Sequence, residues 1–315
     1  MAFPRVMSYD VVIIGDVFYD IMTSPLEDYP ERDTQVGVEF LTSLGGQAGN
    51  CAAACASLGL RTALICKVGS DELSTLLLSV LEGYGVECFT SVSERFRSPG
   101  ITVSIAFRDG SRTMFSYRGA NLDLRHEDIN YDVLRRARFL MRAGHWNTPS
   151  LFAANKKILE FARRECGIPT ALDIGWSAYL GWGEDARNSV LELLPETEFL
   201  FVNERELKAL AGISDVKKCV RKLLDLGCKN VVLHLGERGS AWLSEDLEVR
   251  VGAFRVEVRR PTGAGDAFNA GFIFAFLKGK SPEDCLRFAN ACGAAHLQKG
   301  EGYPTLEEVK ALLGE

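Results

Sequence analysis

Short apolar runs rich in β-branched residues alternate with helical patterns along most of this chain, and this alternation restricts the fold more than any other feature. The first run, residues 9–15, reads Tyr-Asp-Val-Val-Ile-Ile-Gly and is typical of a strand buried on both faces, as in parallel sheets. Further buried strands are predicted at 62–68, 139–143, 170–174, 199–202 and 230–235. Because helical patterns separate these strands, the sequence predicts an α/β fold with a doubly wound, mainly parallel sheet flanked by helices.

The first half of the chain contains strands that this alternation does not explain. They are predicted at 36–41, 86–93, 101–107 and 112–117. Asp109-Gly110 has the residue types of a hairpin turn and joins the last two. We therefore expect a small antiparallel layer beside the main sheet. No linker or repeat divides the chain, so residues 1–315 are predicted to form a single domain.

The composition is that of an ordinary globular protein. Apolar residues make up 47% of the 315 residues, which is enough for a sizeable core. The formal net charge of −6 argues against a broad nucleic-acid-binding face. The nine cysteines form no C-x-x-C pattern and lie mostly in apolar runs, so we interpret them as buried thiols in a reducing compartment. Because no targeting segment or membrane span is evident, the predicted location is cytoplasmic.

A run of small residues before an acid, within 261–271, is the first candidate for chemistry. Asp266 follows three small residues, and a long apolar helix is predicted directly after them. The small residues are Gly263, Ala264 and Gly265. Small side chains let a ligand approach the backbone, and the free N–H groups at a helix N-terminus favour anions. An acid in the first turn can accept a proton from an attacking hydroxyl group, as phosphoryl transfer requires. The alternative is a tight turn in which Asp266 only caps the helix.

A second glycine-rich loop, residues 45–50, also leads into a predicted helix. Its glycines would permit close backbone contact with a ligand, and Asn50 carries both an amide donor and an acceptor. The alternative is an ordinary connection between a strand and a helix. The chain lacks the G-x-x-x-x-G-K-[ST] sequence of a P-loop, and the run at 261–271 does not match the G-x-G-x-x-G fingerprint of a dinucleotide site.

Together the two loops resemble the signatures of the ribokinase-like carbohydrate kinases, or PfkB family. The first signature, a G-x-[GAP]-x-N run followed by small residues and glycines at fixed distances, is matched by Gly46, Ala48, Asn50, Ala52, Gly59 and Gly69. The second is matched from Pro261 to Ile273 except at its first position. The resemblance spans nearly the whole chain and implies a ribokinase-like fold with a small antiparallel β lid. The lid strands would come from about 17–23, 34–43 and 86–120.

The resemblance also implies roles for residues of both loops. Asp266 matches the catalytic base. The anion hole for the transferred phosphoryl group would consist of Gly263, Ala264 and Gly265. Asp20 matches a carboxylate that binds hydroxyl groups of the substrate. The remaining substrate-binding positions, in the sugar-binding loop, would be Gly45, Gly46 and Asn50.

For the nucleotide, the resemblance points to the second half of the chain. Asn203 and Glu206 match an N-x-x-E motif that helps to hold the phosphates and Mg²⁺, with Glu206 acting through water. Gly236 and Gly239 match the turn of the nucleotide site, and Asn290 matches a residue of the adenine pocket. Asn203 could instead be a plain helix cap, and Asn290 a polar residue of an amphipathic helix. The donor would be ATP or ADP.

Several positions depart from the family pattern. Many members have aspartate where this chain has Arg260, and that carboxylate helps to bind a potassium-like cation. An arginine cannot ligate a cation, so either monovalent activation is absent or Arg260 itself supplies the charge. His234 stands where threonine is usual, Gln47 replaces a common lysine, and residues 174–177 read Ile-Gly-Trp-Ser. The last two changes favour an acceptor other than plain ribose.

The leading hypothesis is nucleotide-dependent, in-line phosphorylation of a small sugar, sugar acid or sugar phosphate. Arg118, after the lid hairpin, could bind an anionic group of the acceptor or could be a solvated residue. One alternative is a nucleoside kinase of the same fold, with Trp176 or Phe115 as an aromatic wall. Another is a sensor that binds these ligands without turnover. Exposed lid strands predict a homodimer that forms through the lid, and no nucleic acid or membrane partner is expected.

Overall fold

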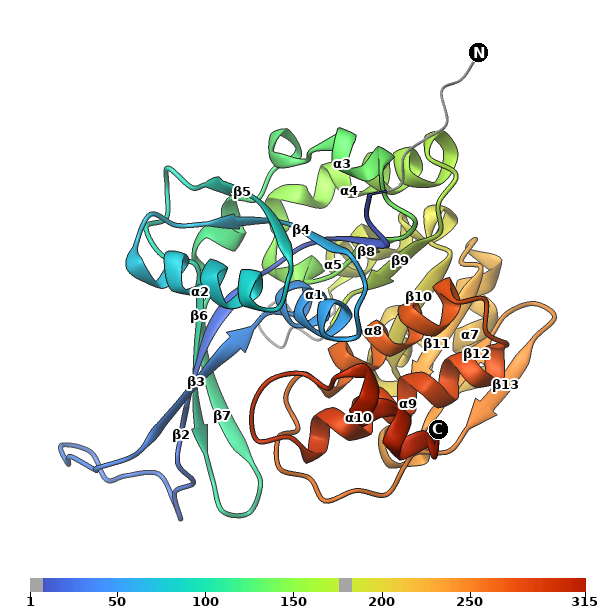
Figure 1. Ribbon diagram of the computed structural model, residues 1–315. Coiled ribbons are helices and arrows are strands. Elements are labelled where there is room, and N and C mark those ends of the chain that lie inside the picture. Colours follow the sequence, from blue (N-terminus) through green and yellow to red (C-terminus); the bar gives the residue numbers. More distant parts are fainter. Residues whose placement is uncertain (1–7, 176–182) are drawn as a thin grey trace.

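The computed structural model of the protein describes residues 8–175 and 183–315 (Figure 1). The strands of its main sheet are β1 (Val11–Ile14), β4 (Thr62–Val68), β5 (Glu87–Val92), β8 (Leu140–Arg142), β9 (Thr170–Asp173), β10 (Phe199–Asn203), β11 (Asn230–His234), β12 (Ser240–Leu243) and β13 (Glu248–Val251). They lie in the order β13-β12-β11-β10-β9-β8-β1-β4-β5. The pairs from β11 to β5 are parallel, whereas β11–β12 and β12–β13 are antiparallel. The predicted doubly wound, mainly parallel sheet is confirmed.

Helices cover both faces of this sheet because successive side chains of each strand point into different cores. In β1, Val11 and Ile13 pack on one side and Val12 and Ile14 on the other. The first side is covered by α1 (Gln47–Ser57), α2 (Glu72–Gly83), α8 (Ala264–Leu277), α9 (Pro282–Gln298) and α10 (Leu306–Leu313). The second is covered by α3 (Tyr131–Arg135), α4 (Phe152–Glu160), α5 (Glu184–Leu191), α6 (Glu204–Ala211) and α7 (Val216–Asp225). None of the helices within the described ranges is long and apolar enough to cross a membrane.

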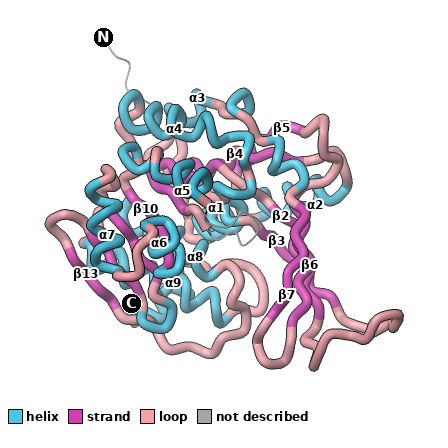
Figure 2. The backbone as a smooth tube through the Cα atoms, turned by 180° about the vertical axis from the view of Figure 1, so that it is seen from behind, coloured by secondary structure: helices cyan, strands magenta, loops and turns pink. Residues whose placement is uncertain are grey.

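A second sheet projects from the main body as the lid (Figure 2). Its strands are β2 (Phe18–Thr23), β3 (Phe40–Gly45), β6 (Gly100–Ala106) and β7 (Arg112–Tyr117), in the order β3-β2-β6-β7. The two outer pairs are antiparallel as predicted, but the central pair, β2 and β6, is parallel. A parallel pair needs a long crossover, and the chain from α1 to β5 provides it by passing through the main body.

The prediction that residues 86–93 belong to the small antiparallel layer was wrong. β5 pairs in parallel with β4 at the edge of the main sheet, and α2 forms the crossover between the two strands. The error has a physical cause. An edge strand leaves many side chains exposed, so β5 shows the polar and apolar mixture that is typical of a half-exposed strand. The strand predicted at 36–41 is also displaced, because β3 begins only at Phe40.

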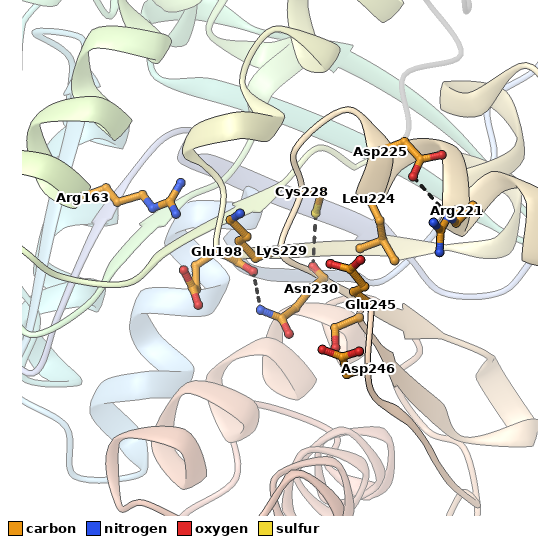
Figure 3. Close-up of a pocket in the computed structure, with 11 residues that line it drawn as sticks. Arg163, Glu198, Arg221, Leu224, Asp225, Cys228, Lys229, Asn230, Glu245 and Asp246 are labelled. Carbon is orange, nitrogen blue, oxygen red and sulfur yellow. Dashed lines mark hydrogen bonds and ion pairs between the residues drawn. The ribbon is translucent and has the colours of Figure 1, made fainter.

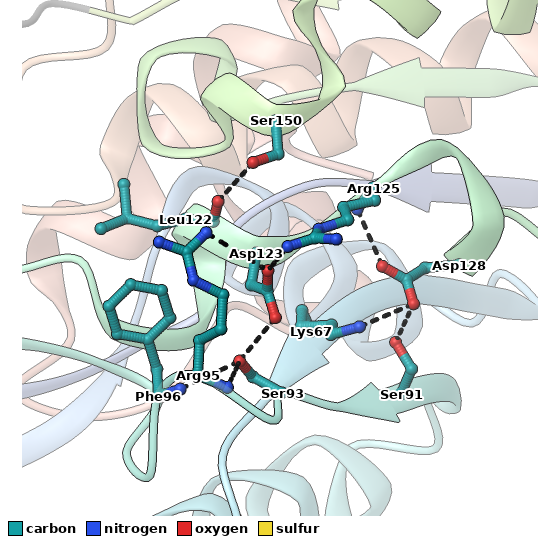
Figure 4. A network of polar contacts seen from close by, with 10 residues as sticks. All are labelled: Lys67, Ser91, Ser93, Arg95, Phe96, Leu122, Asp123, Arg125, Asp128 and Ser150. Atoms are coloured by element: carbon teal, nitrogen blue, oxygen red, sulfur yellow. Dashed lines mark hydrogen bonds and ion pairs between the residues drawn. The ribbon is translucent and has the colours of Figure 1, made fainter.

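Polar contacts hold the segment that follows the lid against the carboxyl ends of β4 and β5 (Figure 4). Lys67 of β4 and Ser91 of β5 both donate to Asp128, at 2.8 and 2.6 Å. Ser93, just after β5, donates to Asp123 at 2.7 Å. These contacts connect the base of the lid to the main sheet.

The carboxyl ends of the parallel strands meet along one edge of the sheet. Polar residues stand there on several strands: Asp16 follows β1, Asp173 ends β9, Asn203 ends β10 and His234 ends β11. In open α/β sheets, ligands bind in the crevice outside this edge. The topology therefore places a candidate site here, at the end of the sheet from which β1 continues into the lid.

Candidate active site

Asp266 lies in the first turn of α8, at a helix start that glycine makes possible. Gly263 directly precedes the helix and has φ +89°, in the left-handed region that favours glycine. No side chain caps this helix N-terminus. Its first backbone N–H groups are therefore open to a ligand. Asp266 does not cap the helix, so the alternative interpretation of this residue was wrong.

The two glycine-rich loops meet at the Asp266 carboxylate. Asn50 Nδ2 donates to Asp266 Oδ2 at 2.8 Å. This contact forms because α1 begins at Gln47, earlier than predicted, which places Asn50 in its first turn, and because α1 packs against α8. Burial, reinforced by the charge of Asp173, raises the pKa of Asp266 well above its usual value, while the Asn50 hydrogen bond opposes that change. A carboxylate with a raised pKa is a stronger proton acceptor.

Asp20 of β2 lies directly over the glycine-rich loop at 45–50. A Cβ at Gly45 would be only 2.3 Å from the Asp20 carboxylate, and one at Gly46 would be 2.7 Å from the Asp16 carbonyl oxygen. Asp20 Oδ1 is buried and has no hydrogen-bond partner within the described part of the chain. Burial raises the pKa of Asp20 to about 6. A buried, unpaired acceptor of this kind is costly, and a hydroxyl group of a substrate would satisfy it.

Asp173 belongs to the same site, although the sequence analysis gave it no role. Gln47 Nε2 donates to its Oδ1 at 2.9 Å, and Asn269 Nδ2 donates to its Oδ2 at 2.6 Å. His234 Nε2 lies 3.1 Å from Asn269 Oδ1, so it carries the proton and donates. Burial raises the pKa of Asp173 to about 6 and lowers that of His234 to about 4. The signal available in the sequence was the position of Asp173 at the end of a buried strand.

Asp16, also missed, supports the loop at 45–50. Its Oδ1 accepts the Ala48 backbone N–H at 3.1 Å, and its Oδ2 accepts the Asn147 amide at 2.7 Å. Asp16 is fully buried, and this burial raises the pKa of its carboxyl. The neighbouring strand β8 ends with Arg142, whose fully buried guanidinium counters that effect by favouring the charged carboxylate. These contacts fix the start of α1 and hence the position of Asn50.

Asn203 and Glu206 form a reciprocal pair at the start of α6. Asn203 Oδ1 accepts the Glu206 backbone N–H at 2.9 Å, and Glu206 Oε2 accepts the Asn203 N–H at 2.8 Å. The structure thus shows the helix cap that the sequence left open for Asn203. Glu206 is buried, and burial together with the charge of Asp173 raises its pKa to about 7. The capping pair therefore stands within electrostatic reach of the centre of the site.

Gly239 and Asn290 come together at the end of β13. A Cβ at Gly239, where φ is +89°, would lie 2.0 Å from the Val251 carbonyl oxygen. Asn290 Nδ2 donates to the carbonyl oxygens of Val251 and Gly252, at 3.2 Å each. Gly236 opens the same turn as Gly239, also with a positive φ. Two of the residues predicted for the nucleotide site, Gly239 and Asn290, therefore contact the same backbone segment.

Two arginines at opposite ends of strand β7 contact the main body. Arg118 Nη1 donates to the Trp146 carbonyl oxygen at 3.0 Å, so part of the guanidinium is engaged by the main body. Arg112, the first residue of β7, donates to the hydroxyl group of Thr262, which immediately precedes Gly263. The sequence analysis singled out Arg118 and overlooked Arg112, because the contact with Thr262 depends on how the lid packs over the body.

Comparisons with known proteins agree with this geometry. The family model for pfkB family carbohydrate kinases matches residues 9–308. Fructokinase-1 of Oryza sativa subsp. japonica is 30% identical over 291 residues, which cover 87% of this chain and 88% of that protein. The nucleoside kinase of Methanothermobacter thermautotrophicus is 28% identical over 299 residues, covering 94% and 91% of the two chains. The structure of Arabidopsis thaliana ribokinase complexed with ribose and ATP superposes with a TM-score of 0.82 and 26% identity, over 98% of this chain and 100% of that one.

The chain belongs to the pfkB family of carbohydrate kinases.

As a member of that family, the protein is a phosphotransferase that acts on a hydroxyl group of a sugar or nucleoside. Its ribokinase-like fold is confirmed as well. A kinase is favoured over a sensor without turnover, because Asp266, the uncapped start of α8 and the glycine-rich loop at 45–50 lie together.

This kinase also has a polar hollow of about 590 Å³ that is unrelated to the site (Figure 3). Its lining includes Glu198, which precedes β10, and Lys229 and Asn230 at the start of β11. These are the amino ends of the parallel strands, whereas Asp173, Asn203 and His234 stand at the carboxyl ends. The hollow therefore lies at the opposite edge of the sheet and takes no part in the site.

Proposed function

We propose that this kinase transfers the γ-phosphoryl group of ATP to a hydroxyl group of a small sugar, sugar acid or sugar phosphate, with Asp266 as the base. The contact between Asn50 and Asp266 carries this proposal. It sets a buried carboxylate beside the open N–H groups at the start of α8. A proton acceptor for the nucleophile and fixed donors for the transferred group are the two elements that phosphoryl transfer needs.

The reaction proceeds by direct, in-line displacement. The Asn50 amide holds one oxygen of Asp266, and the other oxygen accepts the proton of the acceptor hydroxyl group. The hydroxyl oxygen forms a bond to the γ-phosphorus while the bond between that phosphorus and the bridging oxygen of ADP breaks. Backbone N–H groups of Gly263, Ala264 and Gly265 stabilise the negative charge on the transferred group. The products are the phosphorylated acceptor, ADP and protonated Asp266.

The phosphoryl donor would be bound by residues around α6 and near the end of β13. Asn203, Glu206, Gly236, Gly239 and Asn290 would bind ATP, in line with the ATP complex of the Arabidopsis thaliana ribokinase. Among the described residues no group of three or more acidic, histidine or cysteine side chains forms a ready metal site. That suits Mg²⁺ held mainly by phosphate oxygens and water, with Glu206 contacting it through water. When bound, Mg²⁺ neutralises charge on the phosphates.

The acceptor side is built around Asp20 and the loop at 45–50. Asp20 Oδ1 would accept a hydroxyl group of the substrate, and Gly45 gives that carboxylate room. Arg118 would bind an anionic group of the acceptor, because a planar guanidinium recognises carboxylates and phosphates well. A nucleoside acceptor would need an aromatic wall. Phe115 does not provide one, because its register with Val103 and Ile21 places it on the lid face opposite Asp20, while Trp176 lies outside the described residues.

The lid also supports a homodimer. The face that carries Ile21, Val103 and Phe115 is apolar, and Phe115 has 58% of its surface exposed. The other face carries Asp20, Thr102 and Ser116 and belongs to the acceptor site. An apolar face of this kind on a projecting sheet would be buried by a second copy of the chain. Eight of the nine cysteines are buried as thiols, which supports a reducing, cytoplasmic location.

The test is phosphoryl transfer from Mg-ATP, and separately Mg-ADP, to a panel of sugars, sugar acids, sugar phosphates and nucleosides. We expect product with one class of sugar acceptor and none with the Asp266→Asn variant. Product with nucleosides alone would replace the sugar proposal with the nucleoside alternative. Equal turnover by Asp266→Asn would overturn the assignment of the base.

A further inference from the structure

The loop that forms the anion hole is attached to the C-terminal end of α9 by three hydrogen bonds. The backbone N–H groups of Arg259 and Arg260 donate to the Leu297 carbonyl oxygen, at 2.8 and 3.2 Å. His296 Nε2 lies 2.7 Å from the Thr262 carbonyl oxygen and donates to it, because a carbonyl can only accept. A Cβ at Gly263 would lie 3.1 Å from the same nitrogen, so the imidazole stands directly behind the anion hole.

Tyr303 connects this imidazole to the catalytic base. The rings of Tyr303 and His296 are stacked with centroids 5.4 Å apart. The Tyr303 hydroxyl group donates to Asn50 Oδ1 at 2.5 Å, and Asn50 in turn donates to Asp266 at 2.8 Å. Burial raises the pKa of Tyr303 well above its usual value, which keeps this hydroxyl group protonated and donating. The anion hole and the base therefore share one supporting cluster.

Arg260 places a fixed positive charge in this cluster. The residue is only 7% exposed, and its guanidinium carbon lies 6.0 Å from the centre of the Tyr303 ring. Within residues 8–175 and 183–315, no acidic side chain forms an ion pair with it. Its charge instead favours the ionised form of Asp20, where it opposes the effect of burial on the pKa. A buried guanidinium without an ion-pair partner is costly, so it is expected to have a function.

These residues do not fit a bound monovalent cation. Such a cation needs several oxygen ligands, and this loop has a guanidinium at the position where the family pattern often has an aspartate. The Thr262 carbonyl oxygen, the next possible ligand in the loop, already accepts a hydrogen bond from His296 Nε2. A second positive charge beside Arg260 would also be repelled. The expectation that monovalent activation is doubtful thus gains a structural reason.

We infer that Arg260 and His296 replace a bound monovalent cation: the guanidinium supplies the positive charge and the imidazole fixes the loop at 260–263, so that phosphoryl transfer needs no added K⁺ or Na⁺. This inference rests on the proposed kinase function. Both residues act through the anion hole and through Tyr303, and neither touches the reacting atoms, so they are positioning residues. A charge built into the chain is always present, whereas a bound cation must be captured from solution.

The first experiment measures turnover in chloride salts of K⁺, Na⁺ and tetramethylammonium at equal ionic strength. For the wild type we expect kcat to agree within about twofold across the three salts, since the loop at 260–263 offers no site for a cation. In Arg260→Ala we expect kcat to fall by at least about tenfold, with partial recovery on adding millimolar guanidinium ion. Arg260→Lys should retain more activity than Arg260→Ala. A merely structural role would not respond to guanidinium.

The matched control is Arg259→Ala. Arg259 is the adjacent residue, its side chain is 62% exposed and it faces Glu257, so its loss should leave kcat and the salt response unchanged. Saturable activation of the wild type by K⁺ would overturn the inference. So would equal kcat values for the Arg260→Ala and Arg259→Ala variants.

A second readout does not depend on turnover. The thermal unfolding midpoint of the wild type should be the same in K⁺ and tetramethylammonium, and guanidinium at millimolar concentration should raise the midpoint of Arg260→Ala but not that of Arg259→Ala. A rise of the wild-type midpoint in K⁺ would contradict the inference even if no acceptor were phosphorylated. An absence of product with unchanged unfolding behaviour would count against the proposed function alone.

Discussion

Asn50 and Asp266 are separated by 216 positions in the sequence, yet the Asn50 amide donates to the Asp266 carboxylate at 2.8 Å. The contact joins the start of α1 to the start of α8. It also adjusts the acidity of the base, because an N–H donor stabilises the ionised carboxylate while burial favours the neutral one. Replacement of either residue should therefore alter the activity or its pH dependence while the protein still folds.

Replacement of Asp266 by asparagine should remove the proton acceptor while keeping the shape of the side chain. We expect kcat to fall by about 10³-fold with little change in the KM for either substrate. Initial rates at saturating ATP and acceptor measure this effect, with the thermal unfolding midpoint as a check on folding. Asp246→Asn, an exposed acid at the far edge of the sheet, is the control and should retain full activity.

Replacement of Asn50 by alanine should change the pH dependence of the reaction. The variant loses the N–H that favours ionised Asp266, so the pKa of Asp266 rises further. Activity requires the ionised base and increases as pH rises through that pKa. The rising limb of kcat/KM should consequently move to higher pH, by about one unit. An unchanged limb would mean that another group controls it.

Gly45→Ala should damage acceptor binding specifically. The new Cβ would lie 2.3 Å from the Asp20 carboxylate and displace it, whereas φ at this position imposes no strain on alanine. We expect the KM for the acceptor to rise by about tenfold or more, with a smaller change in the KM for ATP. Gly37→Ala is the matched control, because a Cβ there meets nothing within 4 Å. Equal effects in the two variants would refute the assignment of Asp20 to the acceptor.

The Glu206→Gln variant should gain stability relative to the wild type as the pH rises. The pKa of Glu206 is about 7 in the folded protein, against an ordinary value of 4.5. Between these values the folded state binds more protons than the unfolded state, so the stability of the wild type falls as pH increases through this window. Glutamine does not titrate and still accepts the Asn203 N–H. The difference in unfolding free energy should shift in favour of the variant by up to about 3 kcal/mol between pH 4.5 and 8.

Phe115→Glu should disrupt the homodimer that we propose. It introduces a charge on the apolar lid face, where desolvation within an interface is costly. Met114→Glu is the matched control, since Met114 is similarly exposed but lies on the opposite lid face. Sedimentation or light scattering should show a monomer for the first variant and a dimer for the second. A monomeric wild type would exclude the dimer outright.

Much of the fold was predictable because local patterns report which residues become buried. The strand β4 has the predicted bounds, and the long apolar helix predicted at the run of small residues before Asp266 is α8. Burial patterns do not report which strand lies beside which. For that reason β5 was placed in the wrong sheet, and the parallel pairing of β2 with β6 was not foreseen.

For the site, the sequence by itself determined the parts that depend on local backbone chemistry. The small residues before Asp266 and the glycines at 45–50 indicated two candidate ligand-binding loops, because such residues allow close backbone approach and positive φ. The tertiary structure decided which side chains surround them. Asp16, Asp173, His296 and Tyr303 join the site only through contacts between distant segments. Such contacts arise from helix and sheet packing, and no short stretch of sequence encodes them.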